Sequence, residues 1–164
     1  MQYLILIFFA FITAILQSSF AYFFNIKGAF LNLVLIIALY YLTKNQYLKA
    51  IIFALAGGLI LDFFSFSKFG NYLIVLLLAT FMISLFSKFF PLEKIIFKAL
   101  FILFSLSLNV FIFNIINYIF EKRLFLSLTF VSIEIIYNFI GSLIIFYLFD
   151  IMRRRKFFPI NLIT

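Results

Sequence analysis

The chain of 164 residues is 68% hydrophobic and 11% charged, and its formal net charge at pH 7 is +8. Soluble globular domains are about 45–50% apolar and about 25% charged, so this composition excludes a soluble catalytic or nucleic-acid-binding domain and indicates a protein of the lipid bilayer. The sequence has no His and no Cys, which excludes the usual thiolate and imidazole metal sites, Ser-His and Cys-His catalysis and disulfide bonds, and we expect no metal and no cofactor.

Six apolar runs follow one another along the chain. The first covers 3–24; no basic segment precedes it and no small-residue cleavage site follows, so we expect a retained helix and not a signal peptide. The second, 29–43, is the shortest, and it would span only if Lys27 and Lys44 snorkel; a re-entrant or interfacial segment is the alternative. The remaining predicted spans are 49–66, 69–87, 97–120 and 124–149, followed by a basic tail at 150–164.

The distribution of Lys and Arg predicts the orientation of this single all-α, polytopic membrane domain. Six spans place both termini on one side, and if that side is the cytoplasm, nine of the 13 Lys and Arg lie inside, as the positive-inside rule requires. The bias explains the positive charge without nucleic acid. The inside group is Lys44, Lys49, Lys88, Lys94, Lys98, Arg153, Arg154, Arg155 and Lys156, and the outside group is Lys27, Lys68, Lys122 and Arg123.

The last four basic residues of the inside group form a cluster directly after the sixth run. A basic cluster at this place sets topology and attracts anionic lipid by about 1 kcal/mol per residue. A cytoplasmic protein partner could use the same charges, and the sequence leaves both possibilities open.

Small residues and one acid recur every four positions in the third run. Ala50, Ala54, Gly58 and Asp62 therefore share one helix face, and the small residues permit close approach of a neighbouring helix. Asp62 lies about one turn from the outer boundary. One interpretation is a packing seam that ends in an acid paired with Lys68 or capping a turn. The other is that Asp62 organises a site at the outer end of the bundle.

Glu134 lies near the middle of the sixth run, where an unpaired acid costs about 2.5–3.5 kcal/mol. Asn138, Gly141 and Ile145 share its helix face, so we expect this face to point into the protein. Hydrogen bonding between helices is one interpretation; a ligand, ion or proton-coupled site and a contact with a partner helix are the others. Candidate partners are the polar residues of the first and fifth runs, Thr13, Gln17, Ser105, Asn109, Asn114 and Asn117.

The segment after Ala56 carries a more specific pattern. A small-residue and aliphatic stretch is followed by G-x-x-x-D, by a short turn with Ser, and by a Gly that opens the next helix. We expect a tight helix–turn–helix at the outer face. The small residue at the first Gly permits close packing of a neighbouring helix, and the acid and Ser accept hydrogen bonds from backbone N–H groups freed where the helix ends. The last Gly permits a backbone conformation that other residues do not adopt. The residues are Gly57, Gly58, Asp62, Ser65 and Gly70.

This pattern resembles the MreD family of rod shape-determining membrane proteins. Length and the six-span layout agree with that family, as do Asn138 and the basic end. Family members often have Pro followed by Asp or Asn where the second helix begins. This chain has Leu31 followed by Asn32 at that place.

The resemblance implies a non-enzymatic scaffold in the cytoplasmic membrane of rod-shaped bacteria. It implies partnership with MreC, a single-span protein, and through it a link between MreB filaments and the peptidoglycan synthases, RodA and its transpeptidase. It also implies a fold similar to the substrate-binding subunits of energy-coupling-factor vitamin transporters, which provides an alternative function with Asp62, Glu134, Asn109 and Asn138 as candidate ligands. A lipid-modifying enzyme is disfavoured, because Asp62 and Glu134 are expected at different depths.

Overall fold

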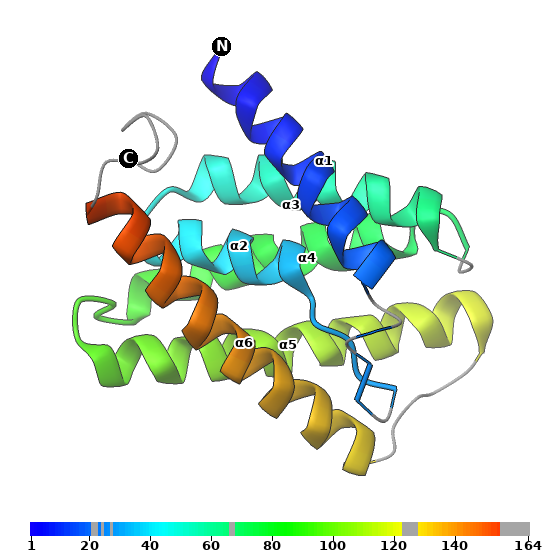
Figure 1. The fold of residues 1–164 in the computed structure, drawn as a ribbon. Helices are drawn as coiled ribbons and strands as arrows, with labels where there is room; N and C mark the ends of the chain where they lie inside the picture. Colours follow the sequence, from blue (N-terminus) through cyan, green and yellow to red (C-terminus); the bar gives the residue numbers. More distant parts are fainter. Residues whose placement is uncertain (21–22, 24, 27, 66–67, 123–127, 155–164) are drawn as a thin grey trace.

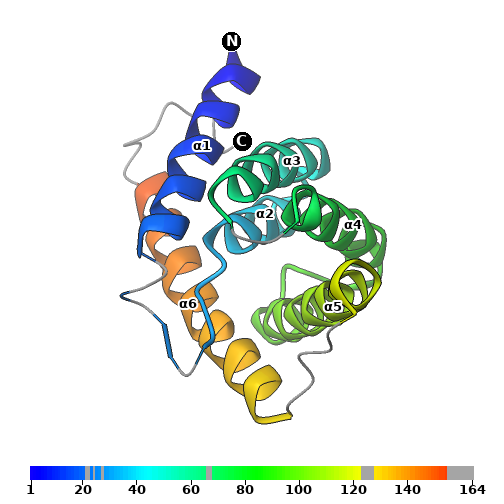
Figure 2. The same cartoon turned by 90° about the vertical axis from the view of Figure 1, so that its right-hand side faces the viewer.

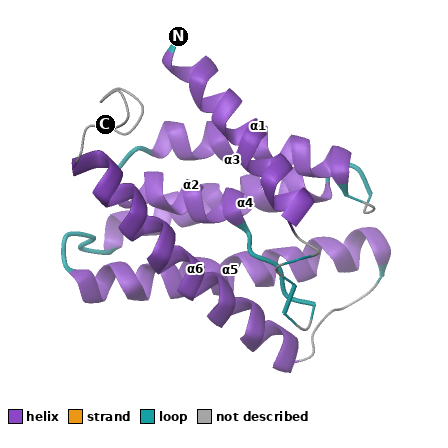
Figure 3. Cartoon of the chain, in the orientation of Figure 1, coloured by secondary structure: helices purple, strands orange, loops and turns teal. Residues whose placement is uncertain are grey.

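The computed structural model describes residues 1–164 except 21–22, 24, 27, 66–67, 123–127 and 155–164. The described part is helical and contains no strand, which confirms the all-α prediction (Figure 3). Its elements in chain order are α1 (Gln2–Phe20), α2 (Leu33–Thr43), α3 (Tyr47–Phe64), α4 (Asn71–Phe86), the 3₁₀ turn η1 (Ser87–Phe89), α5 (Ile95–Glu121) and α6 (Leu128–Arg154).

Five helices of the described chain are long and apolar enough to cross a membrane: α1, α3, α4, α5 and α6. The remaining helix, α2, has 11 residues. At 1.5 Å per residue it covers about 16 Å, roughly half of a 30 Å hydrocarbon core. The count of six spans therefore stays a prediction, because α2 could cross only together with the non-helical residues that precede it.

The long helices alternate in direction (Figure 1). In this view α3 and α5 run from left to right, and α4 and α6 run back. The helix α2 begins in the interior of the bundle and ends on the left, where α3 starts. The beginning of α1 and the end of α6 lie toward the left of the view, together with the α2–α3 and α4–α5 connections, so the short α2 returns the chain to the end at which α1 began.

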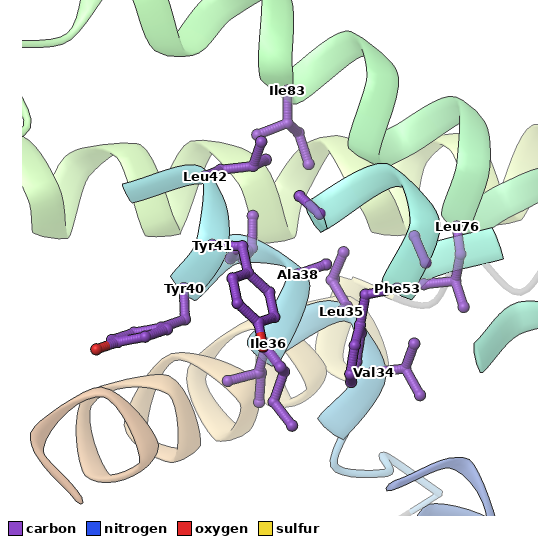
Figure 4. Packing of buried hydrophobic residues seen from close by; sticks show 14 of the residues in the cluster. Val34, Leu35, Ile36, Ala38, Tyr40, Tyr41, Leu42, Phe53, Leu76 and Ile83 are labelled. Carbon is purple, nitrogen blue, oxygen red and sulfur yellow. The ribbon is translucent and has the colours of Figure 1, made fainter. Parts of the chain in front are cut away.

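The core of the bundle is built around α2. All residues from Val34 to Thr43 are buried, and α2 contacts each of the other five helices. Figure 2 shows α2 enclosed by α1, α3, α4, α5 and α6. An apolar surface on every side is typical of a helix that is buried in a protein core or spans a membrane, and here α2 is buried in the core. In Figure 4, Tyr41 and Leu42 of α2 lie among core residues that include Phe53 of α3 and Ile83 of α4.

Candidate functional site

Asp62, near the end of α3, caps the beginning of the next helix. The backbone N–H groups of Tyr72 and Leu73 donate to its two carboxyl oxygens, at 2.8 and 3.0 Å. These groups belong to the first turn of α4 and have no acceptor within their own helix. The Asp62 side chain is buried, whereas Lys68 donates from Nζ to the carbonyl of Phe120 at 2.5 Å. The geometry is thus that of a cap, and not of an ion pair with Lys68.

Two adjacent glycines let α3 approach two different helices. A Cβ atom on Gly58 would lie 2.9 Å from the Cα atom of Leu73 in α4, and one on Gly57 would lie 2.5 Å from Cγ1 of Val34 in α2. Real Cβ atoms do not come so close to other heavy atoms. Gly58 and Asp62, one turn apart, therefore bring α3 and the beginning of α4 together, while Gly57 serves the contact with the central helix.

The α3–α4 turn and its continuation are held by further polar contacts. The Ser65 hydroxyl donates to the carbonyl of Asp62 at 3.3 Å. Gly70, immediately before α4, has a φ of +96°, a conformation in which glycine is strongly preferred. The buried Asn71 side chain donates to Oδ1 of the buried Asn117 at 2.6 Å, so α4 is also bound to α5 near this end of the bundle.

Asn138 connects α6 to the non-helical chain in front of α2. Its Oδ1 atom accepts from the backbone N–H of Asn32 at 2.7 Å, and its Nδ2 atom donates to the carbonyls of Phe30 and Glu134, both at 3.0 Å. Non-helical backbone inside a membrane protein is tolerated only when its polar groups find partners. A single buried amide provides several of these partners, although it lies 106 residues away from Asn32 in the sequence.

The first turn of α2 finds acceptors on the residue before it and on α1, and room for the preceding chain on α6. Asn32 is its N-cap and accepts from the backbone N–H of Leu35 at 3.1 Å. Gln17 of α1 accepts from the N–H of Val34 at 3.0 Å. On α6, Gly141 leaves room for the Leu31 side chain, which a Cβ atom there would meet. The helix α2 can therefore begin in the interior of the bundle without unsatisfied N–H groups.

Glu134 and Asn109 line a crevice between α2, α5 and α6, together with Asn32 and Asn138. Within the described residues, Oε2 of Glu134 and Oδ1 of Asn109 are buried without a hydrogen-bond partner. Glu134 is the seventh residue of α6, about 9 Å from its beginning. Within the described helix, Leu128–Arg154, Glu134 thus lies nearer the beginning than the middle, and its depth in the membrane stays a prediction.

The other polar residues proposed as partners of Glu134 bond elsewhere. Thr13, Ser105 and Asn114 each donate to the carbonyl four residues earlier in their own helix. Gln17 and Asn117 contact α2 and α4, as described above. The structure thus brings Asn109, Asn138 and Asn32 to Glu134, and the remaining predicted partners serve other helix contacts.

An ion-pair cluster at the opposite end of α6 was not expected from the sequence. Oδ1 of Asp150 accepts from Lys44 Nζ at 2.8 Å and from the Tyr40 hydroxyl at 3.0 Å, and Oδ2 lies 4.0 Å from Lys98 Nζ. The predicted basic tail begins at Asp150, but α6 continues through this residue to Arg154. Asp150 lies one helical turn after Phe146, which is buried, so helical spacing from the apolar run is the only sequence signal that points to it.

The predicted basic cluster lies only partly within the described residues. Arg153 and Arg154 belong to the last turn of α6, and the Arg153 side chain is exposed. Arg155 and Lys156 lie outside the described residues.

Comparison with known proteins identifies the family. The family model of rod shape-determining protein MreD matches residues 1–155, nearly the whole chain, which confirms the resemblance found in the sequence. No curated protein and no solved structure matches the chain. The expected similarity of fold to energy-coupling-factor subunits therefore stays a prediction. The chain belongs to the MreD family of rod shape-determining membrane proteins.

Proposed function

We propose that this chain is a non-enzymatic membrane scaffold of the bacterial elongation complex, which helps to maintain rod shape by linking MreC, MreB and the peptidoglycan synthases. Family membership supports the broader statement, a role in rod shape determination in a family not known for enzymatic activity. The finer assignment, including a cytoplasmic membrane location with both termini in the cytoplasm, is ours. The beginning of α1, the end of α6 and the α2–α3 and α4–α5 connections gather toward one end of the bundle, which supports the orientation (Figure 1).

The observation that carries the proposal is the use of the buried polar groups. Asp62 caps α4, Asn138 holds the chain before α2, and Asn71 bonds to Asn117. Each of these contacts joins two parts of the protein to each other. A bundle stabilised in this way presents a fixed outer surface, which a scaffold needs in order to bind several partners in a defined arrangement.

The same contacts weigh against catalysis by Asp62. Both of its carboxyl oxygens accept backbone N–H groups of α4. A general acid or base must instead reach a proton on the substrate. Asp62 is therefore expected to matter for the stability of the bundle and not for a chemical step.

The alternative is a substrate-binding subunit of a vitamin or metabolite transporter, in which the crevice beside Glu134 would receive the ligand. The crevice leaves no room for even a water molecule, whereas sites for small molecules usually enclose about 300–1,000 Å³. Both N–H groups of the Asn138 amide and its oxygen are also engaged in contacts within the protein. These observations favour the scaffold.

Co-purification tests the scaffold directly. The tagged chain is produced in the membrane with an MreC-like single-span protein and, as a matched control, with the same partner carrying an unrelated apolar span. We expect a stable complex with the first partner and none with the second. The transporter subunit would instead be supported if the chain does not bind the MreC-like protein, carries a small molecule detectable by mass spectrometry, and binds an ATPase.

A further inference from the structure

Three helices bring two cations to one acid at the end of the bundle that holds the α2–α3 and α4–α5 connections. Lys44 directly follows α2, Lys98 is in the first turn of α5, and Asp150 is four residues before the end of α6. Figure 1 shows these helix ends on the same side of the molecule. Both lysine side chains are 22% exposed and the Asp150 side chain is 36% exposed, so the cluster is partly accessible from outside.

The carboxylate of Asp150 forms a hydrogen-bonded ion pair with Lys44 and only a longer ion pair, without a hydrogen bond, with Lys98. Lys44 and the Tyr40 hydroxyl both donate to Oδ1, at 2.8 and 3.0 Å. Lys98 Nζ is 4.0 Å from Oδ2, too far for a hydrogen bond, and lies 5.3 Å from the centre of the Phe146 ring. An ammonium group has three N–H donors, and within the described residues those of Lys98 have no hydrogen-bond acceptor.

Two features near this cluster indicate the chemistry of a ligand. Arg153, one turn after Asp150, is exposed and adds a further positive charge. Large apolar side chains next to the cluster in sequence are exposed as well, namely Ile95 and Ile96 before Lys98 and Tyr147 before Asp150. A ligand that fits both features has an anionic head and apolar chains. Basic pockets between membrane helices bind the head groups of anionic lipids for this reason.

We propose that Lys98 and Lys44, with Arg153, form a specific site for the phosphate of an anionic phospholipid, distinct from the general attraction that the basic tail exerts. In this arrangement Asp150 positions Lys44 at the junction of α2 and α6, and Lys98 supplies the free donors for the phosphate. The acyl chains of the lipid lie against the exposed apolar residues at the beginning of α5.

Native mass spectrometry of the full-length chain in detergent tests the site, with phosphatidylglycerol and phosphatidylcholine of identical acyl chains as the two probes. We expect retention of phosphatidylglycerol over phosphatidylcholine. Lys98→Gln should weaken phosphatidylglycerol binding about fivefold, and the double variant Lys44→Gln/Lys98→Gln about twenty-five-fold. The single Lys98 variant preserves the bond between Lys44 and Asp150, so it is expected to fold normally, which circular dichroism checks.

The matched control is Arg155→Gln/Lys156→Gln, which removes the same number of positive charges from the tail. We expect this variant to keep at least half of the preference for phosphatidylglycerol. The proposal is overturned if the wild type binds both lipids equally, or if the tail variant loses the preference while the Lys44/Lys98 variant keeps it. Retention of added inorganic phosphate in place of lipid would also contradict it.

Discussion

Replacement of Asp62 by Ala is expected to destabilise the junction between α3 and α4. The variant loses two hydrogen bonds to the first turn of α4, at 2.8 and 3.0 Å. Hydrogen bonds to charged groups contribute about 1.5–3 kcal/mol each in soluble proteins. Polar contacts in membrane bundles average about 0.6 kcal/mol and reach about 1.7, because the unfolded chain in the membrane also finds partners. For the two bonds together we expect a loss of about 2–3 kcal/mol in the free energy of unfolding.

The conservative variant Asp62→Asn separates the loss of acceptors from the loss of side-chain volume. Its amide keeps one acceptor oxygen but places an NH₂ group opposite the second backbone N–H. We therefore expect it to lose more than half as much stability as the Ala variant, although its size is unchanged.

The assay is unfolding of the purified chain in mixed micelles with increasing SDS, followed by circular dichroism, together with hydrogen exchange at the first turn of α4. Ser107→Ala serves as the control, since this exposed hydroxyl bonds only within its own helix; it should change stability by less than about 0.5 kcal/mol. If Asp62→Ala unfolds like the wild type and its α4 amides exchange no faster, the capping role assigned to Asp62 is refuted.

Three further predictions concern the other contacts between helices. Gly57→Ala should lower the thermal unfolding midpoint, because its Cβ atom would lie 2.5 Å from Val34 Cγ1, and adding Val34→Ala should recover part of the loss; a double variant less stable than both single ones would contradict this. Asn138→Leu removes three hydrogen bonds and should lower the free energy of unfolding by about 2 kcal/mol, with faster amide exchange in the residues before α2. Unchanged exchange would show that Asn138 does not hold this segment. A double-mutant cycle with Asn71→Ala and Asn117→Ala should give a coupling of about 0.6–1.7 kcal/mol in SDS unfolding, and a coupling of zero would show that this bond contributes nothing.

Apolar run length predicts most of the fold, and α2 shows where it fails. The run 29–43 is apolar except for Asn32 and the terminal Thr43, so composition does not show that its helix begins only at Leu33. The boundary is set by local turn chemistry and by distant partners. Gly28 has a φ of +90°, and its N–H bonds to the Asn25 side chain at 2.6 Å. The turn residues were visible in the sequence, whereas the partners on α1 and α6 were not.

Helical periodicity predicts which face a polar residue lies on, but not what it contacts. The four-residue spacing placed Gly58 and Asp62 on one face, and the structure shows that this face meets the beginning of α4. The spacing on α6 placed Asn138 toward the protein, where it is buried. Its partners are backbone groups near Asn32, and no pattern within α6 encodes them. Asp150 was missed because a charge at the end of an apolar run resembles the start of a tail.

Depletion of the protein in its native host tests the central claim, a scaffold role in rod shape, most directly. Cells are imaged while the protein is depleted, with a plasmid copy of the wild type as the complementing control. The scaffold predicts that rod cells widen and become round, and that the wild-type copy restores rods. Cells that keep their rod shape after depletion, but lose uptake of a nutrient, would contradict it.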